Sequence, residues 1–198
     1  MNVSLEEVLG SISVSRETFE RLAVFEDLVK KWSAKINLVS RKSLSELRSR
    51  HTIDSIQVLR ITSLEGHWVD LGSGGGFPGI VAAILAREVA PELRFTLVES
   101  DKRKATFLRT AVRETRVNCH VLCERIENAS GQAASILSAR ALADLSTLLI
   151  FCEKHLESDG IALFPKGVTW KKEVEEARRD WAFEVTPIPS QTEQGSVI

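Results

Sequence analysis

The sequence contains no apolar run of about 18 residues, the length that a membrane-spanning helix requires, and no signal-peptide pattern. Its three cysteines include no C-x-x-C pair, so we expect no metal cluster. Acidic and basic residues nearly balance, 27 against 26, and a net charge of −1 creates no global field that attracts nucleic acid. We therefore expect a soluble, cytoplasmic protein without a metal site.

Positive charge is nevertheless concentrated in two segments. Residues 30–51 include seven Lys or Arg and only one acid, Glu46, and residues 102–116 include six and only Glu114. Residues 1–29 have the opposite balance, with six acids and two bases. Either segment alone is most simply a solvated helix face, but two basic patches on a neutral protein fit a nucleic-acid contact on one face.

The chain has 198 residues, enough for one α/β domain with a short appendage. Apolar residues recur at helical spacing from Ser15 to Trp32, and residues 43–61 form another predicted helix, interrupted near His51. From Trp68 onward strand-like and helix-like segments alternate, which favours a parallel sheet covered on both faces. The predicted strands are 67–71, 94–99, 118–123, 135–139, 160–165 and 182–187, and the predicted helices between them are 78–89, 101–115, 144–156 and 170–181.

The most informative stretch follows the first predicted strand, where four glycines fall within residues 72–76 and are followed by Phe77 and Pro78. Glycines let the backbone turn sharply and approach a ligand closely, because no Cβ intervenes. Pro78 suits the first position of a helix, where its missing N–H would have had no partner. The loop therefore directs the N-terminus of a helix at a bound molecule.

The spacing of these glycines distinguishes between two nucleotide-type ligands. A dinucleotide fingerprint, G-x-G-x-x-G, would need glycine where Phe77 stands, and Pro78 removes a donor that a phosphate would use. The form G-x-G-x-G after an apolar-Asp-apolar strand is instead the pattern of methyltransferases that use S-adenosylmethionine (SAM). Glu99, at the end of the next strand, could accept both ribose hydroxyl hydrogens of either cofactor, so it does not discriminate.

Five polar or glycine positions fall just after predicted strand ends: Gly72, Glu99, the segment 124–127, Arg140 and Lys166. In parallel sheets ligands bind beyond the carboxyl ends of the strands, where the strand order reverses. We therefore expect these five positions to converge on one crevice.

Seven short motifs follow one another along nearly the whole chain. They are Asn37-Leu38-Val39-Ser40, Arg50-His51-x-x-Asp54-Ser55, the run from Asp70 to Gly79, Glu99-Ser100-x-Lys102-Arg103 with Phe107-Leu108-Arg109 after it, Arg125-Ile126-Glu127, Ser138-Ala139-Arg140-Ala141 and Lys166-Gly167. In this order they resemble the GidB (glucose-inhibited division protein B) family, bacterial methyltransferases that modify N7 of a guanine in 16S ribosomal RNA. The glycine loop alone would indicate only a methyltransferase, whereas the order of all seven motifs is specific.

The resemblance implies a Rossmann-like SAM-dependent methyltransferase fold with a mostly parallel, twisted sheet. It implies an N-terminal helical extension, residues 1–61, packed on a SAM-binding domain, residues 62–198. Many relatives have Ser-Arg-Ala where this chain has Ser138-Ala139-Arg140-Ala141, with one residue inserted. The family sheet ends in an antiparallel seventh strand between the fifth and the sixth, and Ile198 falls inside that strand, so we expect it to be truncated.

The resemblance also assigns roles to individual residues. SAM would be the cofactor, leaving as S-adenosylhomocysteine, and 16S rRNA in the small ribosomal subunit would be the partner. The implied cofactor-binding residues are Gly72, Gly74, Gly76 and Phe77 at the methionine and ribose, Glu99 at the ribose hydroxyls, Ile126 and Glu127 at the adenine, and Arg140 where cofactor and target base meet. The implied RNA-binding residues are Arg50, His51, Lys102, Arg103, Arg140 and Lys166, of which Arg140 and Lys166 would position the substrate, while Asp54 would help link the N-terminal helices to the site.

The chemistry of this reaction fits the absence of an evident catalytic His or carboxylate pair. N7 of guanine carries a lone pair and no proton, so its attack on a sulfonium methyl needs no general base, only alignment. Because positive charge moves onto the purine, a cation beside N7 would hinder, and we hypothesise that Arg140 and Lys166 bind phosphate or the rRNA backbone. His51 is most simply structural, hydrogen-bonded to a neighbouring backbone group or to Asp54.

Three alternatives remain open at this stage: an NAD-dependent oxidoreductase, a SAM-dependent enzyme acting on a small molecule, and a non-catalytic RNA-binding module. Phe77 and Pro78 argue against the first, and the two basic segments argue against the second. Any affinity for SAM would count against the third. We expect a monomer that does not contact membranes, because no additional apolar stripe stands out.

Overall fold

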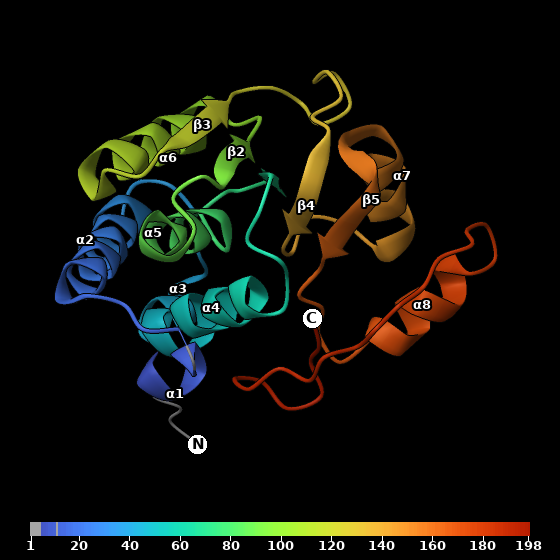
Figure 1. Ribbon diagram of the computed structural model, residues 1–198, viewed down its shortest axis with the longest axis horizontal. Coiled ribbons are helices and arrows are strands. Elements are labelled where there is room, and N and C mark those ends of the chain that lie inside the picture. The colour runs from blue at the N-terminus through green and yellow to red at the C-terminus, as the bar shows by residue number, and fades with distance from the viewer. Residues whose placement is uncertain (1–4, 11) are drawn as a thin grey trace.

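The computed structural model describes residues 5–10 and 12–198 of the chain. Five parallel strands form one sheet in the order β3-β2-β1-β4-β5. Helices cover both faces of the sheet (Figure 1), so the predicted α/β fold with a parallel sheet is confirmed. The strands are β1 (His67–Leu71), β2 (Arg94–Val98), β3 (Cys119–Leu122), β4 (Ala134–Ala139) and β5 (Leu156–Leu163).

The central strands β1, β2 and β4 are buried along almost their whole length, as expected for strands covered on both faces. In their register, Val69 of β1 lies beside Thr96 of β2 and Leu137 of β4. Successive side chains of β1 enter opposite halves of the core, Trp68 on one face and Val69 on the other. The sheet thus separates two apolar clusters and fixes the strand ends at which a ligand can bind.

The helices that connect the strands lie against these two faces. One face carries α5 (Gly79–Val89) and α6 (Lys102–Thr115), and the other carries α7 (Leu145–His155), on which α8 (Trp170–Ala177) packs. Helix α5 is continuously buried from its start to Ala86, because the sheet covers one side and N-terminal helices cover the other. Although α5 is apolar all round, neither it nor any other described helix is long and apolar enough to cross a membrane.

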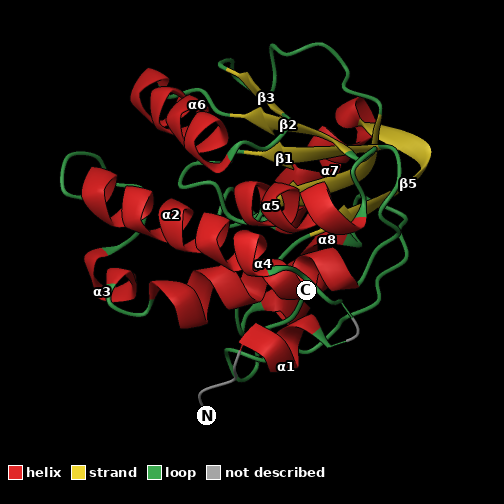
Figure 2. Cartoon of the chain, turned by 60° about the vertical axis from the view of Figure 1, so that its left-hand side comes forward, coloured by secondary structure: helices red, strands yellow, loops and turns green. Residues whose placement is uncertain are grey.

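The N-terminal helices extend the core on the α5 side of the sheet. Figure 2 shows α2 lying between α6 and α4, and residues of both flanking helices share one hydrophobic cluster with the sheet. We therefore propose that residues 1–61, of which 1–4 and 11 lie outside the described part, form one structural unit with residues 62–198. These elements are α1 (Leu5–Leu9), α2 (Arg16–Ser33), α3 (Arg41–Leu44), the π-helix η1 (Arg48–Thr52) and α4 (Ile53–Arg60).

The interruption predicted near His51 is the π-helix η1, and a buried carboxylate holds it. Glu26 of α2 is only 4% exposed. Its carboxylate accepts hydrogen bonds from the Arg48 guanidinium at 2.7 Å and from the Thr52 hydroxyl at 2.8 Å. Because these two residues are the first and last of η1, Glu26 fixes both ends of the turn that contains Arg50 and His51.

The C-terminal third departs from the predicted elements. Strand β5 begins at Leu156, directly after α7, and α8 ends at Ala177 rather than at residue 181. The predicted strand 182–187 is wrong, since these residues form no strand and are mostly exposed. Their alternating apolar pattern has no sheet neighbour to pair with, and Pro187 offers no backbone donor.

The end of the chain forms isolated bridges outside the five-stranded sheet. Val197 lies antiparallel to both Lys166 and Pro189. The Lys166 amide donates to the Val197 carbonyl at 2.8 Å, and the Ile198 amide donates to the Ile188 carbonyl at 2.9 Å. The last residues therefore lie between the segment that follows β5 and residues 188–190.

We predict that Gly79→Ala destabilises the protein. A Cβ on Gly79 would lie 2.8 Å from Oδ2 of Asp70 and would also collide with Leu97. Such overpacking costs about 1–3 kcal/mol, more than the gain of about 1 kcal/mol in helix propensity. Urea unfolding of Gly167→Ala is the control, because a Cβ there meets nothing within 4 Å. Equal stability of the two variants would contradict the close packing inferred for α5.

Candidate functional site

Two adjoining cavities open at the carboxyl ends of the strands, beside the point where the strand order reverses between β1 and β4. Their volumes are about 490 and 370 Å³. Gly72, Lys104 and Ala141 line both, so the cavities meet at the glycine loop. The expected convergence of Gly72, Glu99, segment 124–127, Arg140 and Lys166 holds across the two cavities together.

The glycine loop is shaped by packing at some positions and left open at another. Gly72 and Gly76 have positive φ angles of 62° and 83°, and a Cβ on them would meet Leu142 at 2.6 Å and Ile80 at 2.8 Å respectively. Gly74, with φ of 49°, has no atom within 3.5 Å of its Cβ position, the nearest being 3.6 Å away. Gly74 therefore borders free space that a ligand can approach, whereas Gly76 lines neither cavity.

Glu99 supports the loop and faces the smaller cavity. It is 7% exposed, and its two carboxylate oxygens accept from the backbone amides of Gly74 at 2.9 Å and Asp101 at 2.8 Å. A carboxylate has about four acceptor sites, so lone pairs remain for a ligand hydroxyl. The same side chain can therefore fix the loop and bind a ribose.

The segment after β3 forms the other wall of the smaller cavity. Ile126 is 8% exposed and presents an apolar surface there, while Glu127 beside it is exposed. The His155 imidazole of α7 donates from Nε2 to the Ile126 carbonyl at 3.1 Å and anchors the segment. Both residues thus border the smaller cavity, which Glu99 also lines.

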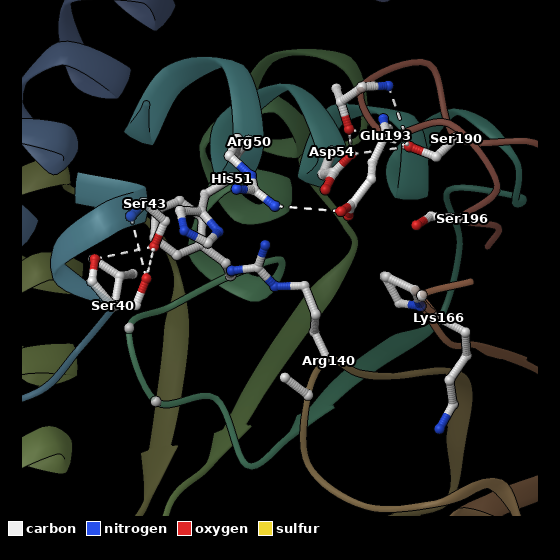
Figure 3. Close-up of a pocket in the computed structure, with 18 of the residues that line it drawn as sticks. Ser40, Ser43, Arg50, His51, Asp54, Arg140, Lys166, Ser190, Glu193 and Ser196 are labelled. Carbon is white, nitrogen blue, oxygen red and sulfur yellow. Dashed lines mark hydrogen bonds and ion pairs between the residues drawn. The ribbon is translucent and has the colours of Figure 1, made fainter. Parts of the chain in front are cut away.

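Arg140 and Phe77 meet in the larger cavity, drawn in Figure 3. The Arg140 guanidinium carbon lies 5.2 Å from the centroid of the Phe77 ring, a cation–π contact. Burial lowers the pKa of Arg140, although the carboxylates of Asp54 and Asp70 oppose that shift. Within the described part of the chain the guanidinium has no hydrogen-bond or ion-pair partner. Its donors face the cavity, as Figure 3 shows.

The ammonium of Lys166 points elsewhere. It donates to the Ala143 carbonyl at 2.9 Å and to a Glu173 carboxylate oxygen at 2.7 Å, and Figure 3 shows it directed away from Arg140. Lys166 lines the larger cavity, but its ammonium is already paired with the Glu173 carboxylate. The structure therefore does not bring its ammonium together with the Arg140 guanidinium.

The other basic residues divide into two groups. Arg50 lines the larger cavity and pairs with Glu193 at 3.4 Å. Lys102 and Arg103 are exposed at the start of α6 and line neither cavity. Sequence reasoning missed Lys104, which borders both cavities and is the third basic residue of that run. Because Lys104 lies in the first turn of the helix that follows Glu99, the sequence did indicate that it could reach the ligand site.

A polar wall of the larger cavity comes from the C-terminal segment, which the sequence did not single out. The carboxylate of Asp54 accepts from the hydroxyls of Thr192 and Ser190. The backbone amide of Gln191 donates to the side-chain oxygen of Gln57 at 2.9 Å. Because Asp54 and Gln57 both belong to α4, this helix holds residues 190–192 in place. Burial raises the pKa of Asp54, which these hydrogen bonds oppose.

His51 is not the hydrogen-bonded structural residue that we expected. Both ring nitrogens are buried, and neither has a hydrogen-bond partner among the described residues. The ring instead packs on Phe77, with centroids 5.2 Å apart, and lines the larger cavity. Burial, together with the nearby charges of Arg140 and Arg50, lowers the pKa of His51 to about 3. The imidazole is therefore neutral at physiological pH.

With this geometry in view, comparisons with known proteins identify the family. A family model described as rRNA small subunit methyltransferase G, GidB, matches residues 18–195. The chain belongs to the GidB family. A protein of Ruegeria sp. (strain TM1040) named ribosomal RNA small subunit methyltransferase G is 56% identical over 187 residues, 94% of this chain and 91% of the relative. A protein of the same name from Ruegeria pomeroyi is 55% identical over 189 residues, 96% and 93% of the two chains.

Solved structures support the fold of this GidB-family protein. A SAM-dependent methyltransferase from Aquifex aeolicus has a TM-score of 0.57 at 12% identity, covering 83% of this chain and 92% of that chain. The Rossmann-like methyltransferase fold is thus confirmed, and the chain is an rRNA small subunit methyltransferase. The oxidoreductase alternative is wrong.

We predict that His51 remains neutral between about pH 5 and pH 8, whereas an unperturbed histidine titrates at about 6.5. Below about pH 6.5 the imidazole of His51 is protonated in the unfolded chain but stays neutral in the folded chain until the pH approaches 3. The contribution of His51 to the free energy of unfolding is therefore lost as pH falls from about 6.5 toward 3. The Cε1–H resonance of His51, followed by NMR, should therefore not shift in this window. A midpoint above pH 5 would show that the ring is not buried as described.

Proposed function

We propose that this methyltransferase transfers the methyl group of SAM to N7 of a guanine in 16S rRNA. The observation that carries the proposal is the meeting of two different cavities at Gly72 and Ala141. The smaller has the features that an adenosyl group needs, and the larger has unpaired donors and room for a base. The transferred methyl would lie where the two cavities join.

The residues of the smaller cavity fit SAM. Glu99 would bind the ribose hydroxyls, and Ile126 and Glu127 would border the adenine. Gly74, which lines the larger cavity beside Gly72, leaves open space for close backbone approach. Gly72 and Phe77 would continue the site toward the methionine end. When bound, SAM supplies an electrophilic methyl group on a sulfonium. Of the cofactor residues that the resemblance implied, Gly76 acts by packing rather than by contact.

The larger cavity fits a target base that needs positioning rather than deprotonation. His51 is neutral, and Asp54 accepts hydroxyl hydrogens from its neighbours, so neither is arranged to remove a proton. N7 of guanine has no proton to lose, and alignment of the nitrogen with the methyl group is the main requirement. The guanine must also leave its stack, which is least costly in a single-stranded loop.

Basic side chains around the larger cavity would bind the rRNA backbone. Arg140 has free donors in the cavity, which Arg50 and Lys104 also line. Lys102 and Arg103 extend this surface along α6, and phosphate contacts of this kind position an RNA without reading its sequence. Lys166 would join them if the substrate displaced Glu173. We further propose that the protein acts in the cytoplasm as a monomer.

Transfer of tritium from labelled SAM tests the proposed function. We expect label in isolated small ribosomal subunits, none in a low-molecular-weight extract, and labelled 7-methylguanine after hydrolysis of the rRNA. SAM, but not NADH, should raise the melting temperature, because only a ligand of the folded state stabilises it. Label at another atom of the base, or in small molecules, would overturn the assignment of N7.

Two substitutions should affect binding of the cofactor and binding of the RNA separately. Glu99→Gln removes a charged acceptor facing the smaller cavity, and we expect the Kd for SAM to rise about 10-fold or more. Arg140→Ala removes donors from the larger cavity, and we expect it to weaken subunit binding about 10-fold with little effect on SAM. Isothermal titration with SAM and filter binding with subunits measure the two effects. The reverse result for Arg140 would place it in the cofactor site.

A further inference from the structure

Three polar atoms of the larger cavity remain without a role in the proposed function. They are Nδ1 and Nε2 of His51 and Oγ of Ser196, all buried and without a hydrogen-bond partner in the described part of the chain. Buried polar atoms are nearly always paired in native proteins, because leaving one unpaired is unfavourable. In Figure 3 His51 and Ser196 lie on opposite sides of the cavity. Their arrangement indicates a ligand with hydrogen-bonding edges.

The orientation of His51 is fixed from outside the cavity. It lies in η1, and π-helical turns are frequently found at functional sites. Glu26 holds both ends of this turn through Arg48 and Thr52. The ring rests on Phe77, with centroids 5.2 Å apart, and His51 lines the larger cavity. A side chain held in this way can bind a ligand without first being ordered.

The charges around His51 keep the imidazole neutral. Arg50 from η1 and Arg140 after β4 are the cations near it. The carboxylates that share the cavity are already engaged, Asp54 by hydroxyls of the C-terminal segment and Glu193 by Arg50. A neutral imidazole offers one N–H donor and one nitrogen acceptor. His51 can therefore accept a hydrogen bond, which a protonated histidine could not.

We propose that His51 is a specificity-determining residue whose neutral imidazole accepts a hydrogen bond from an N–H group of the guanine that is methylated. This inference rests on the proposed function. As the methyl group moves to N7, positive charge develops on the purine and its N–H groups become stronger donors. An acceptor at such an N–H is therefore bound more tightly in the transition state than in the ground state, which raises kcat rather than lowering KM. The Ser196 hydroxyl, which also has no partner in the described part of the chain, lies across the cavity from His51.

The test compares the wild-type protein with His51→Phe, His51→Asn and His51→Gln in steady-state methylation of small ribosomal subunits. The Phe variant keeps the ring packing on Phe77 but removes the acceptor. We expect its kcat to fall about 10- to 100-fold, the range of one hydrogen bond lost in the transition state, with the Kd for SAM unchanged. Asn and Gln each place an amide oxygen near one of the ring nitrogens, and one of them should restore most of the lost kcat.

Two controls distinguish this role from a structural one. His120→Phe makes the same replacement on the exposed face of β3, outside both cavities, and should leave kcat unchanged. Wild-type kcat should be independent of pH between about 5.5 and 8, because His51 stays neutral. His51→Ala replaces His51→Phe in the comparison if the Phe variant proves unfolded by thermal melting.

Each outcome decides the inference. Loss of kcat in the Phe variant with rescue by an amide supports it. Full kcat in the Phe variant, or failure of both amides to restore activity in folded protein, overturns it while leaving the proposed function intact. A wild-type kcat that depends on an ionisation near pH 6.5, abolished in His51→Gln, would show proton transfer instead. A wild-type protein that methylates no rRNA would refute the proposed function itself.

Discussion

Close packing of the glycine loop against the N-terminal helices is the constraint on which the rest of the site depends. A Cβ on Gly75 would lie 3.0 Å from the Leu38 carbonyl oxygen, and one on Gly76 would lie 3.1 Å from the Phe25 ring. The loop that borders both cavities is therefore held from one side by β1 and α5 and from the other by α2 and the segment that follows it. The N-terminal segment consequently shapes the larger cavity, and a change in its packing would move the loop that borders both cavities.

Phe77 transmits this packing to the substrate side. Its ring contacts Phe25 of α2 at a centroid distance of 5.0 Å, His51 at 5.2 Å and the Arg140 guanidinium at 5.2 Å. A residue that would obstruct a dinucleotide pyrophosphate here packs against both His51 and Arg140 in the larger cavity. A bulky ring at the position of a fingerprint glycine thus disfavours a dinucleotide and packs the side chains that we propose contact the substrate.

The sequence predicted those features that depend on local pattern. Strands β1, β2 and β4, the glycine loop and Glu99 follow from apolar periodicity and from the rule that parallel strands present ligands at their carboxyl ends. The direction of long side chains depends instead on distant partners: Glu173 draws the Lys166 ammonium away from the cavity, and no local pattern predicts that pairing. Likewise, Asp54 and Thr192 are 138 residues apart, so the wall that they form was invisible in the sequence.

The charges that line the larger cavity bear on the proposed chemistry. His51 is uncharged and the Asp54 carboxylate accepts hydrogen bonds from two hydroxyls, while the Arg140 guanidinium lies against the same Phe77 ring as His51. A reaction that makes a cationic purine is opposed by positive charge at the base but not by positive charge at the phosphates. In the proposed reaction N7 would therefore have to lie away from the Arg140 guanidinium, whose donors would bind phosphate instead.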